Sequence, residues 1–422
     1  MTFNFKLCGT TSVIALFAFG AAAQADIVVS VLRAATGNEV QTALYETMAT
    51  EYEAANPSID IQIEFIDNES FKQKLPTMLQ SDERPDIFYS WGGGVLQEQA
   101  EVGFLEDITA QVTGEWAAEY SAAGVAAFTV DGKIVGVPTS ASDVGFWANR
   151  DLAAKAGIDL DAIKTWADFL AAVDAAKAAG ITPIVAGGKD KWPLHFYLGY
   201  LSVRIAGKDG FAAAMAGEGD GFAAPAFLEA ANQFKALVDK KAFQPGFMDT
   251  DYGTASGMFG DGKAVFHLMG DWDYGASRGQ SASGQGLSDA QLALVRFPAV
   301  EGGAGAATDT FGGINGWAVA KGASPEALAF LRWLNGKENQ SREAAQGFYI
   351  PVAIGADAAV VNPFFQQISS SLAASQFHQI FLDQALGADV GATFNDASAD
   401  LASGAISPED AVAAIQEAWS FK

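Results

Sequence analysis

Cysteine and histidine are both scarce in this chain. Cys8 is the single cysteine among 422 residues, so neither a disulfide framework nor a cysteine-based metal site can form. The three histidines, His195, His267 and His378, show no H-E-x-x-H spacing. We therefore expect no metal centre and no histidine-based catalytic triad. The glycine-rich segments match no dinucleotide or phosphate loop, so no cofactor is expected.

Positive charge is also in short supply. The chain has 25 lysines and arginines against 50 aspartates and glutamates, which gives a formal net charge of -25. This surplus argues against nucleic acid and anionic membranes as partners. It also disfavours a strongly anionic ligand, although a local basic pocket could override the global sign. Solubility is the simpler explanation of the charge.

Residues 1–25 predict a secretory signal peptide. Lys6 gives a positive start, residues 11–20 form an apolar run, and Ala23-Gln24-Ala25 fits a small-x-small cleavage site before Asp26. The run is too short to span a bilayer, which disfavours an uncleaved anchor. Cys8 precedes the run, whereas a lipid-carrying cysteine would follow it. We therefore expect a periplasmic protein with a Sec-type signal that is not a lipoprotein.

From residue 26 onward, the hydrophobic pattern predicts an α/β protein. Apolar or alternating runs indicate strands at 26–32, 59–66 and 85–90, and helical spacing indicates helices between them at 39–55 and 70–81. This order describes an open parallel sheet, in which ligands lie beyond the carboxyl ends of the strands. Arg33, Lys72 and Trp91 fall at or near that edge, and Asn38 lies in the turn after the first strand.

The remaining chain predicts a second lobe, because roughly 400 residues are too many for one ordinary core. Residues 133–148 are expected to form two extended pieces joined by 138–143, as a first crossing between lobes. Residues 311–320 suit a second crossing. Residues 276–288 are rich in glycine, serine and glutamine and predict a mobile loop.

The prediction of function depends on two segments that each contain a tryptophan. Residues 187–195 carry Lys191, Trp192 and His195, and residues 269–274 carry Trp272 between two aspartates. Each follows a predicted strand, and a flat apolar ring beside fixed polar groups suits a sugar. The alternative for each tryptophan is simple core packing. His195 lies three residues after Trp192 on one helix face, so ligand contact and packing both remain open for it.

Asp271 and Asp273 support the only enzymatic hypothesis. In an extended segment they would share one face, roughly 6.6 Å apart by strand rise. That separation falls in the range of an inverting glycosidase pair. The alternative is that one carboxylate binds sugar hydroxyls while the other bonds to backbone.

Several motifs, taken in order, resemble the family 1 extracellular solute-binding proteins of carbohydrate import systems, the maltose-binding-like group. The motifs are Arg84-Pro85-Asp86-Ile87-Phe88, Gly103-Phe104-Leu105-Glu106-Asp107-Ile108, Val137-Pro138 followed by Phe146-Trp147-Ala148-Asn149-Arg150-Asp151, Thr165-Trp166-Ala167-Asp168-Phe169, and Gly262-Lys263-Ala264 before Met269-Gly270-Asp271-Trp272. Their order from Arg84 to Trp272 is more specific than any one of them.

The resemblance implies a type II periplasmic-binding-protein fold, with two α/β lobes joined by multiple crossings around a ligand cleft. An N-terminal lobe of 26–140 and 312–365 and a C-terminal lobe of 141–311 and 366–422 are expected. Trp272 would be a stacking platform, with Asp143, Trp192 and Asp271 in the cleft and Lys72, Trp91 and Asn315 opposite. The family often has an aromatic-rich segment after the first strand, where this chain has Leu32-Arg33-Ala34-Ala35-Thr36, and Arg33 is our substitute.

Three functions follow from these patterns. The first is a monomeric periplasmic protein that binds a di- or trisaccharide and delivers it to the membrane permease of an ABC transporter, without catalysis. The ligand-binding residues expected for it are Arg33, Asn38, Lys72, Trp91, Asp143, Lys191, Trp192, His195, Asp271, Trp272, Asp273 and Asn315. The alternatives are a secreted glycosidase using Asp271 and Asp273, and a binding protein for a polyol or another non-sugar solute.

Overall fold

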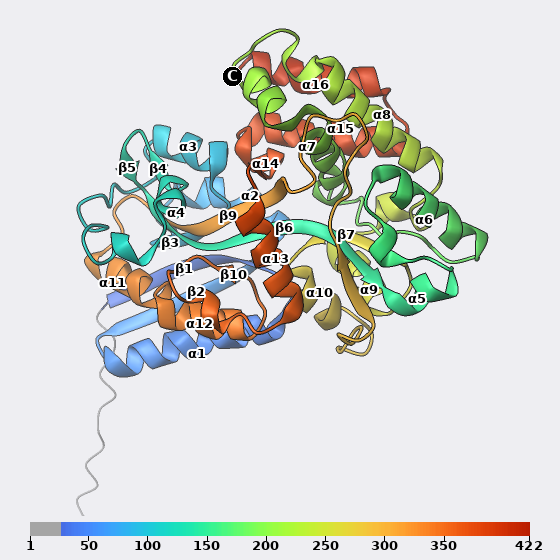
Figure 1. Cartoon of the computed structure of the whole chain (residues 1–422). Helices are drawn as coiled ribbons and strands as arrows, with labels where there is room; N and C mark the ends of the chain where they lie inside the picture. Colours follow the sequence, from blue (N-terminus) through green and yellow to red (C-terminus); the bar gives the residue numbers. More distant parts are fainter. Residues whose placement is uncertain (1–26) are drawn as a thin grey trace, which may run out of the picture.

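The computed structural model describes residues 27–422. The predicted signal peptide, its cleavage site and Cys8 lie outside the described residues. In Figure 1 the described chain forms two α/β halves side by side, with β6 running from one to the other. No helix between residues 27 and 422 combines the length and the hydropathy needed to cross a membrane.

Strands and helices alternate between residues 27 and 101, whereas helices predominate from residue 150 onward. The strands are β1 (Ile27–Ala35), β2 (Ile59–Asp67), β3 (Ile87–Ser90), β4 (Thr129–Val130), β5 (Lys133–Ile134), β6 (Gly136–Asn149), β7 (Phe266–Gly270), β8 (Leu292–Val295), β9 (Thr310–Val319), β10 (Ile350–Pro351) and β11 (His378–Ile380). The α-helices are α1 (Glu39–Ala55), α2 (Asn68–Met78), α3 (Gly93–Glu101), α4 (Ala122–Ala126), α5 (Arg150–Lys155), α6 (Trp166–Ala178), α7 (Trp192–Met215), α8 (Pro225–Asp239), α9 (Tyr252–Gly260), α10 (Asp273–Gly279), α11 (Pro325–Leu334), α12 (Lys337–Ala345), α13 (Pro363–Ala374), α14 (Leu382–Ala385), α15 (Ala388–Ser403) and α16 (Pro408–Ser420).

The predicted parallel sheet at the start of the chain is confirmed. β1 pairs in parallel with β2 and with β3, and β3 continues into an antiparallel pair with β9. Val31 and Leu32 of β1 point to opposite faces and are both almost fully buried, because a central strand of a sheet covered on both faces needs apolar side chains. The carboxyl ends of β1 and β3 therefore deliver Arg33 and Trp91 to the same edge.

Helix starts follow local hydrogen bonding. The side chain of Asn38 accepts from the backbone N–H groups of Val40 and Gln41 and caps α1. Thr165 and Asp168 form a capping box at α6, since each side chain bonds to the other residue's backbone N–H. The Asn38 cap explains why the sequence pattern located α1 closely.

The first crossing is one strand rather than the two joined pieces expected. β6 runs for 14 residues from Gly136 to Asn149, with a register shift between Pro138 and Ser140. Its first part pairs with β9, and residues 144–149 pair with β7 and β8. The prediction of a break was wrong because the ladder absorbs Pro138 at a bulge, where no backbone donor is needed.

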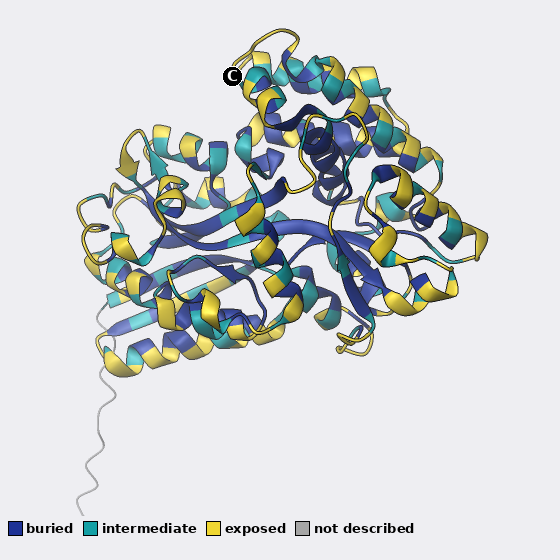
Figure 2. Cartoon of the chain, viewed as in Figure 1, coloured by how far each residue is buried: buried dark blue, intermediate teal, exposed yellow. Residues whose placement is uncertain are grey.

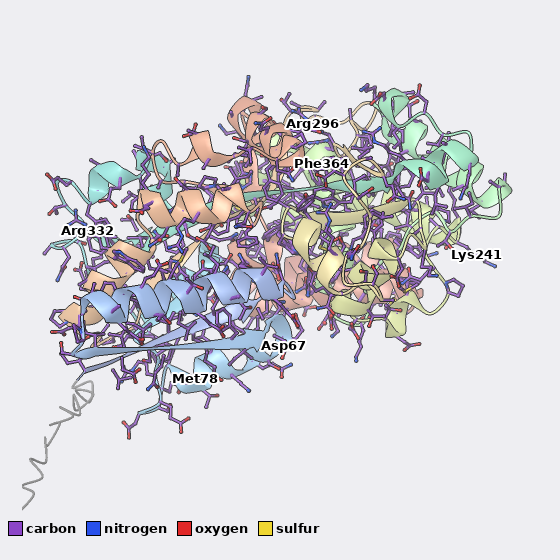
Figure 3. The ribbon with its side chains drawn as sticks, turned by 90° about the horizontal axis from the view of Figure 1, so that it is seen from below. Asp67, Met78, Lys241, Arg296, Arg332 and Phe364 are labelled. Atoms are coloured by element: carbon purple, nitrogen blue, oxygen red, sulfur yellow. The ribbon has the colours of Figure 1, made fainter. Side chains whose placement is uncertain are left out.

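The buried side chains separate into groups that define two lobes (Figure 2). We call the part built on β1–β3 with α1–α4, α11 and α12 the first lobe. The part built on β7 and β8 with α5–α10 and α14–α16 is the second lobe. In Figure 3, Arg332 and Met78 lie in the first lobe, Lys241 lies in the second, and Phe364 of α13 lies between them. The residue boundaries predicted for the lobes remain a prediction.

The segment after β7 folds differently from the expected extension. Trp272 has helical backbone angles (φ -57°, ψ -25°), and α10 begins at Asp273. Because α10 continues to Gly279, the first part of the predicted loop at 276–288 is helical. Asp271 and Asp273 therefore do not alternate along a strand, and the separation of roughly 6.6 Å derived from strand rise does not apply.

Candidate functional site

A cavity lies between the two lobes. It encloses about 850 Å³ of space free of protein atoms, including the part open to solvent. The cavity walls come from both lobes and from the strands that connect them, and its lining includes Arg33, Gln41, Asn68, Lys72, Tyr89, Trp91, Ser140, Ser142, Trp192, Phe196, Tyr252, Asp271, Trp272, Asn315, Tyr349, Phe381, Asp383 and Gln384.

The second lobe supplies an aromatic wall. Trp192 opens α7 and Trp272 follows β7, with their ring centroids 6.5 Å apart. Trp192 also contacts the ring of Tyr252 at 4.9 Å, and Trp272 meets Phe381 at 5.9 Å. The indole of Trp272 lies over Gly270, where any Cβ would overlap the ring. Glycine at 270 is therefore what allows the indole to lie against the strand end.

Four polar atoms of cavity-lining residues are buried and have no hydrogen-bond partner among residues 27–422. Two are donors, Arg33 Nη1 and Trp192 Nε1, and two are acceptors, Asp271 Oδ1 and Asn315 Oδ1. Leaving a buried polar group unpaired costs about 1–3 kcal/mol, so native chains rarely keep several in one place. A ligand that both accepts and donates hydrogen bonds would satisfy all four.

Arg33 is held by aromatic rings instead of hydrogen bonds. Its guanidinium carbon lies 4.4 Å from the Tyr45 ring centroid, 4.8 Å from that of Tyr89 and 5.4 Å from that of Trp317. The side chain is 3% exposed and makes no hydrogen bond to a described residue. Burial raises the pKa of the nearby Glu343 carboxyl to about 7, although the charge of Arg33 opposes the rise.

Lys72 connects the lobes across the cavity. Its Nζ lies 3.1 Å from Oδ2 of Asp383 in α14, and 5.6 Å from the ring centroid of Trp91. Asp383 is buried, which by itself would raise its pKa, but the charge and the hydrogen bond of Lys72 oppose this effect and the pKa is lowered. Since Lys72 belongs to α2, this pair needs the two lobes to be close together.

Seven of the twelve predicted site residues line the cavity: Arg33, Lys72, Trp91, Trp192, Asp271, Trp272 and Asn315. Their contact with a ligand remains a prediction. The other five, Asn38, Asp143, Lys191, His195 and Asp273, do not line it, and each has another structural role. We withdraw these five from the proposed site.

The side chains of Asn38 and Lys191 make other contacts outside the cavity. Asn38 caps α1 through its side-chain oxygen. Lys191 adopts a positive φ of 64°, and its Nζ lies 2.5 Å from Oδ1 of Asp396. This backbone conformation turns the lysine away from the cavity wall formed by the next residue, Trp192.

His195 is a core residue. It is fully buried, its Nδ1 lies 3.1 Å from the carbonyl oxygen of Trp192, and its ring packs against Phe196, Phe311 and Phe394. Burial lowers its pKa to about 4, so the ring is neutral at neutral pH. The shared helix face predicted for Trp192 and His195 instead points His195 into the core of the second lobe.

Asp273 is also sequestered. Its Oδ1 accepts hydrogen bonds from Ser256 at 2.5 Å and from Tyr252 at 3.3 Å. Its Oδ2 lies 3.6 Å from Nε2 of His267, and the residue is 1% exposed. Asp273 thus anchors Tyr252, which does line the cavity, from behind the wall.

Asp143 lies beneath the cavity. Its Oδ1 accepts from the hydroxyl of Tyr200 and from the backbone N–H of Phe311, both at 3.3 Å. Burial raises the pKa of this carboxyl to about 7, and the bond from Phe311 opposes the rise. Asp143 thereby joins β6 to β9 at the point where both strands leave the first lobe.

The stability of the protein should depend on pH through Asp143. Between about pH 4 and pH 7 the unfolded chain loses this proton and the folded chain keeps it, so stability falls as pH rises, by up to about 1.4 kcal/mol per pH unit. Asp143→Asn should remove this dependence. Urea unfolding of both proteins from pH 4.5 to 7.5 measures the difference, and parallel pH profiles would contradict the prediction.

The sequence analysis missed several cavity residues. Tyr349, Phe381, Asp383 and Gln384 lie in short segments that have no periodic pattern. Tyr252 follows Asp251 in a segment that faintly resembles a calcium loop, but it is instead the start of α9. Within residues 27–422, no group of three or more acidic, histidine or cysteine side chains is placed to hold a metal ion.

Two α/β lobes joined by crossing strands around a polar, aromatic cavity define a bilobal solute-binding protein. The chain belongs to the family of bacterial extracellular solute-binding proteins, whose model matches residues 34–341. This match confirms the family resemblance and the type II fold class inferred from the ordered motifs.

Individual relatives are distant. A binding protein of Brucella abortus is 26% identical over 257 residues, 60% of this chain and 59% of the relative, so the match spans less than two thirds of its length. The "Probable sugar-binding periplasmic protein" of Mesorhizobium japonicum is 26% identical over 253 residues, 57% of this chain and 56% of that protein. A solved structure from a study of xylan utilization by Caldanaerobius polysaccharolyticus has a TM-score of 0.85 and 25% identity, covering 92% of this chain and 99% of the other.

Proposed function

We propose that this protein is the periplasmic carbohydrate-binding component of an ABC importer, and that it binds a di- or trisaccharide between its lobes. The observation that carries the proposal is the set of four unpartnered buried polar atoms beside the indoles of Trp192 and Trp272. A pyranose has an apolar C–H face for the rings and hydroxyls that both donate and accept. Family membership and the sugar-binding name of the Mesorhizobium relative support the same class of ligand.

Closure of the lobes would complete the binding site. Arg33 and Asn315 reach the cavity on one side, and Trp192 and Asp271 reach it on the other. A ligand that bridges them favours the closed arrangement by its differential affinity for that state. The closed surface would be the form that the membrane permease recognises. We propose that the protein works as a periplasmic monomer exported by its predicted signal peptide.

A ligand screen tests this function. The panel contains maltose, maltotriose, xylobiose, cellobiose and diacetylchitobiose, with sorbitol and glycerophosphocholine as non-sugar solutes. A true ligand at a thousand times its Kd stabilises the folded protein by about 4 kcal/mol, which thermal-shift measurement detects readily. Stabilisation by a di- or trisaccharide is the expected result. A response confined to sorbitol or glycerophosphocholine would replace the sugar proposal with the non-sugar alternative.

Asp271 should contribute strongly to sugar affinity. Its carboxyl is buried, and burial raises its pKa well above the usual range, so hydroxyl donors of a ligand are the partners that would favour its charged form. Asp271→Ala should weaken binding of the best sugar by about 10- to 100-fold, the worth of a charge-assisted hydrogen bond. Calorimetry measures the change, and Asp209→Ala is the control, because Asp209 is an exposed residue of α7 that does not line the cavity. Unchanged affinity in Asp271→Ala would remove this residue from the site.

The site geometry favours binding over glycoside hydrolysis. A hydrolase needs two carboxyl groups flanking one bond. Here Asp271 lines the cavity, whereas Asp273 is bonded to Ser256 and Tyr252 and does not. Incubation with the panel oligosaccharides should release no new reducing ends. If the parent protein releases new reducing ends and Asp271→Asn does not, the glycosidase alternative is established.

A further inference from the structure

The lobes also meet outside the cavity, at the start of α15. The loop and helix at Gly93–Gly94 of the first lobe pack on the turn between α14 and α15 of the second. A Cβ at Gly94 would lie 2.7 Å from the carbonyl oxygen of Ala385 and 2.7 Å from the backbone nitrogen of Gly387. Only glycine permits this approach, so the two backbones are in direct contact when the lobes are together.

Glu98 of α3 completes this contact through its carboxylate. Its Oε2 accepts a hydrogen bond of 2.9 Å from the backbone N–H of Ala388, the first residue of α15. Its Oε1 lies 3.0 Å from Nζ of Lys422, which also donates to the carbonyl oxygen of Leu386 at 2.8 Å. One first-lobe side chain therefore bonds to two groups of the second lobe, and Lys422 extends the contact to Leu386.

Helix α15 has no side-chain cap of its own. Its N-cap residue is Gly387, which has a φ of 82° and no side chain to accept from the first turn. Acidic groups are favoured at a helix N-terminus because the exposed N–H groups and the helix dipole attract negative charge. Glu98 supplies this cap from the other lobe, so α15 is capped only while the lobes are closed.

The capped turn adjoins the cavity wall. Asp383 and Gln384 of α14 line the cavity, five and four residues before the capped N–H of Ala388. Asp383 is also the partner of Lys72. Fixing the α14–α15 turn against α3 thus fixes two wall residues in the positions that face a ligand.

We infer that Glu98 is a positioning residue for ligand binding: by capping α15 across the lobe boundary it stabilises the closed form and sets the cavity wall, without touching the ligand. The inference rests on the proposed function for its affinity effect. Its effect on lobe closure is independent of which ligand binds.

The test compares three substitutions on α3. Glu98→Ala should raise the Kd of the best panel disaccharide by about threefold to tenfold, in line with the loss of a helix cap. Glu98→Gln retains an acceptor and should lose less. Glu101→Ala is the matched control, because Glu101 bonds only to Gln97 of the same helix among the described residues.

A charge exchange separates the cap from the ion pair. The double variant Glu98→Lys with Lys422→Glu restores an ion pair but places an ammonium against the N-terminus of α15. Affinity should stay weakened, because an ammonium cannot accept from Ala388 N–H. Full recovery in the double variant would overturn the capping role.

Spin labels measure closure without any ligand. Asp82→Cys in the first lobe and Asp400→Cys in the second are both exposed, and the chain expressed from Asp26 has no other cysteine. Glu98→Ala should shift the label distances of ligand-free protein towards longer values, and Glu101→Ala should not. Unchanged distances and affinity in Glu98→Ala would overturn the inference. If no panel compound binds the parent protein, the proposed function fails, while the distances still decide the role of Glu98.

Discussion

Replacing Trp272 by alanine is expected to weaken binding of the best sugar by about 30- to 150-fold, which corresponds to about 2–3 kcal/mol. The indole lies at the cavity between Trp192 and Phe381, over the end of β7. Stacking a sugar face on an indole removes apolar surface from water on both partners. Alanine removes that surface and leaves a void that solvent would fill.

Calorimetry of Trp272→Ala and Trp272→Phe measures the effect, and the phenylalanine variant should retain part of the affinity. Trp333→Ala is the control, because this indole packs on Tyr52 and Phe330 of the first lobe and does not line the cavity. If Trp272→Ala binds as tightly as the parent protein while Asp271→Ala does not, the ligand lies against the polar wall and the stacking role is wrong.

Replacing Arg204 by methionine is expected to lower the free energy of unfolding by about 3–5 kcal/mol, the largest stability effect that the structure predicts. Arg204 of α7 is 1% exposed. It donates to the backbone carbonyl oxygens of Phe297, Pro298, Ala306, Ala307 and Asp309, at 2.8–3.3 Å. Methionine fills similar space but leaves buried carbonyl groups without donors.

These carbonyls belong to the segment between β8 and β9, so the variant should loosen the second crossing as well as the core. Urea unfolding measures the loss of free energy of unfolding. Arg296→Met is the control, because it makes the same change at an exposed arginine. Arg296 is labelled in Figure 3 on the same segment. A loss below about 1 kcal/mol in Arg204→Met would show that water replaces the guanidinium at these carbonyls.

Local patterns were sufficient for most of the scaffold. The alternation of β2, the spacing of α1 and the capping box of α6 are each set by neighbours within a few residues. The same holds for the glycine and tryptophan that end β7, which is why the sequence pattern located Trp272 at a strand end.

What the sequence by itself determined is the order of strands and helices, the parallel first sheet and the family of the protein, because each depends on patterns of apolar side chains and caps that are local in the chain. Only the tertiary structure decided which of two neighbouring aspartates faces the cavity. It sends Asp271 to the cavity and Asp273 to Ser256, because a helix rather than a strand begins between them. Tertiary structure likewise brought Glu98 to α15, 290 residues further along the chain. Contacts of this kind depend on how two lobes pack, and no local pattern encodes that.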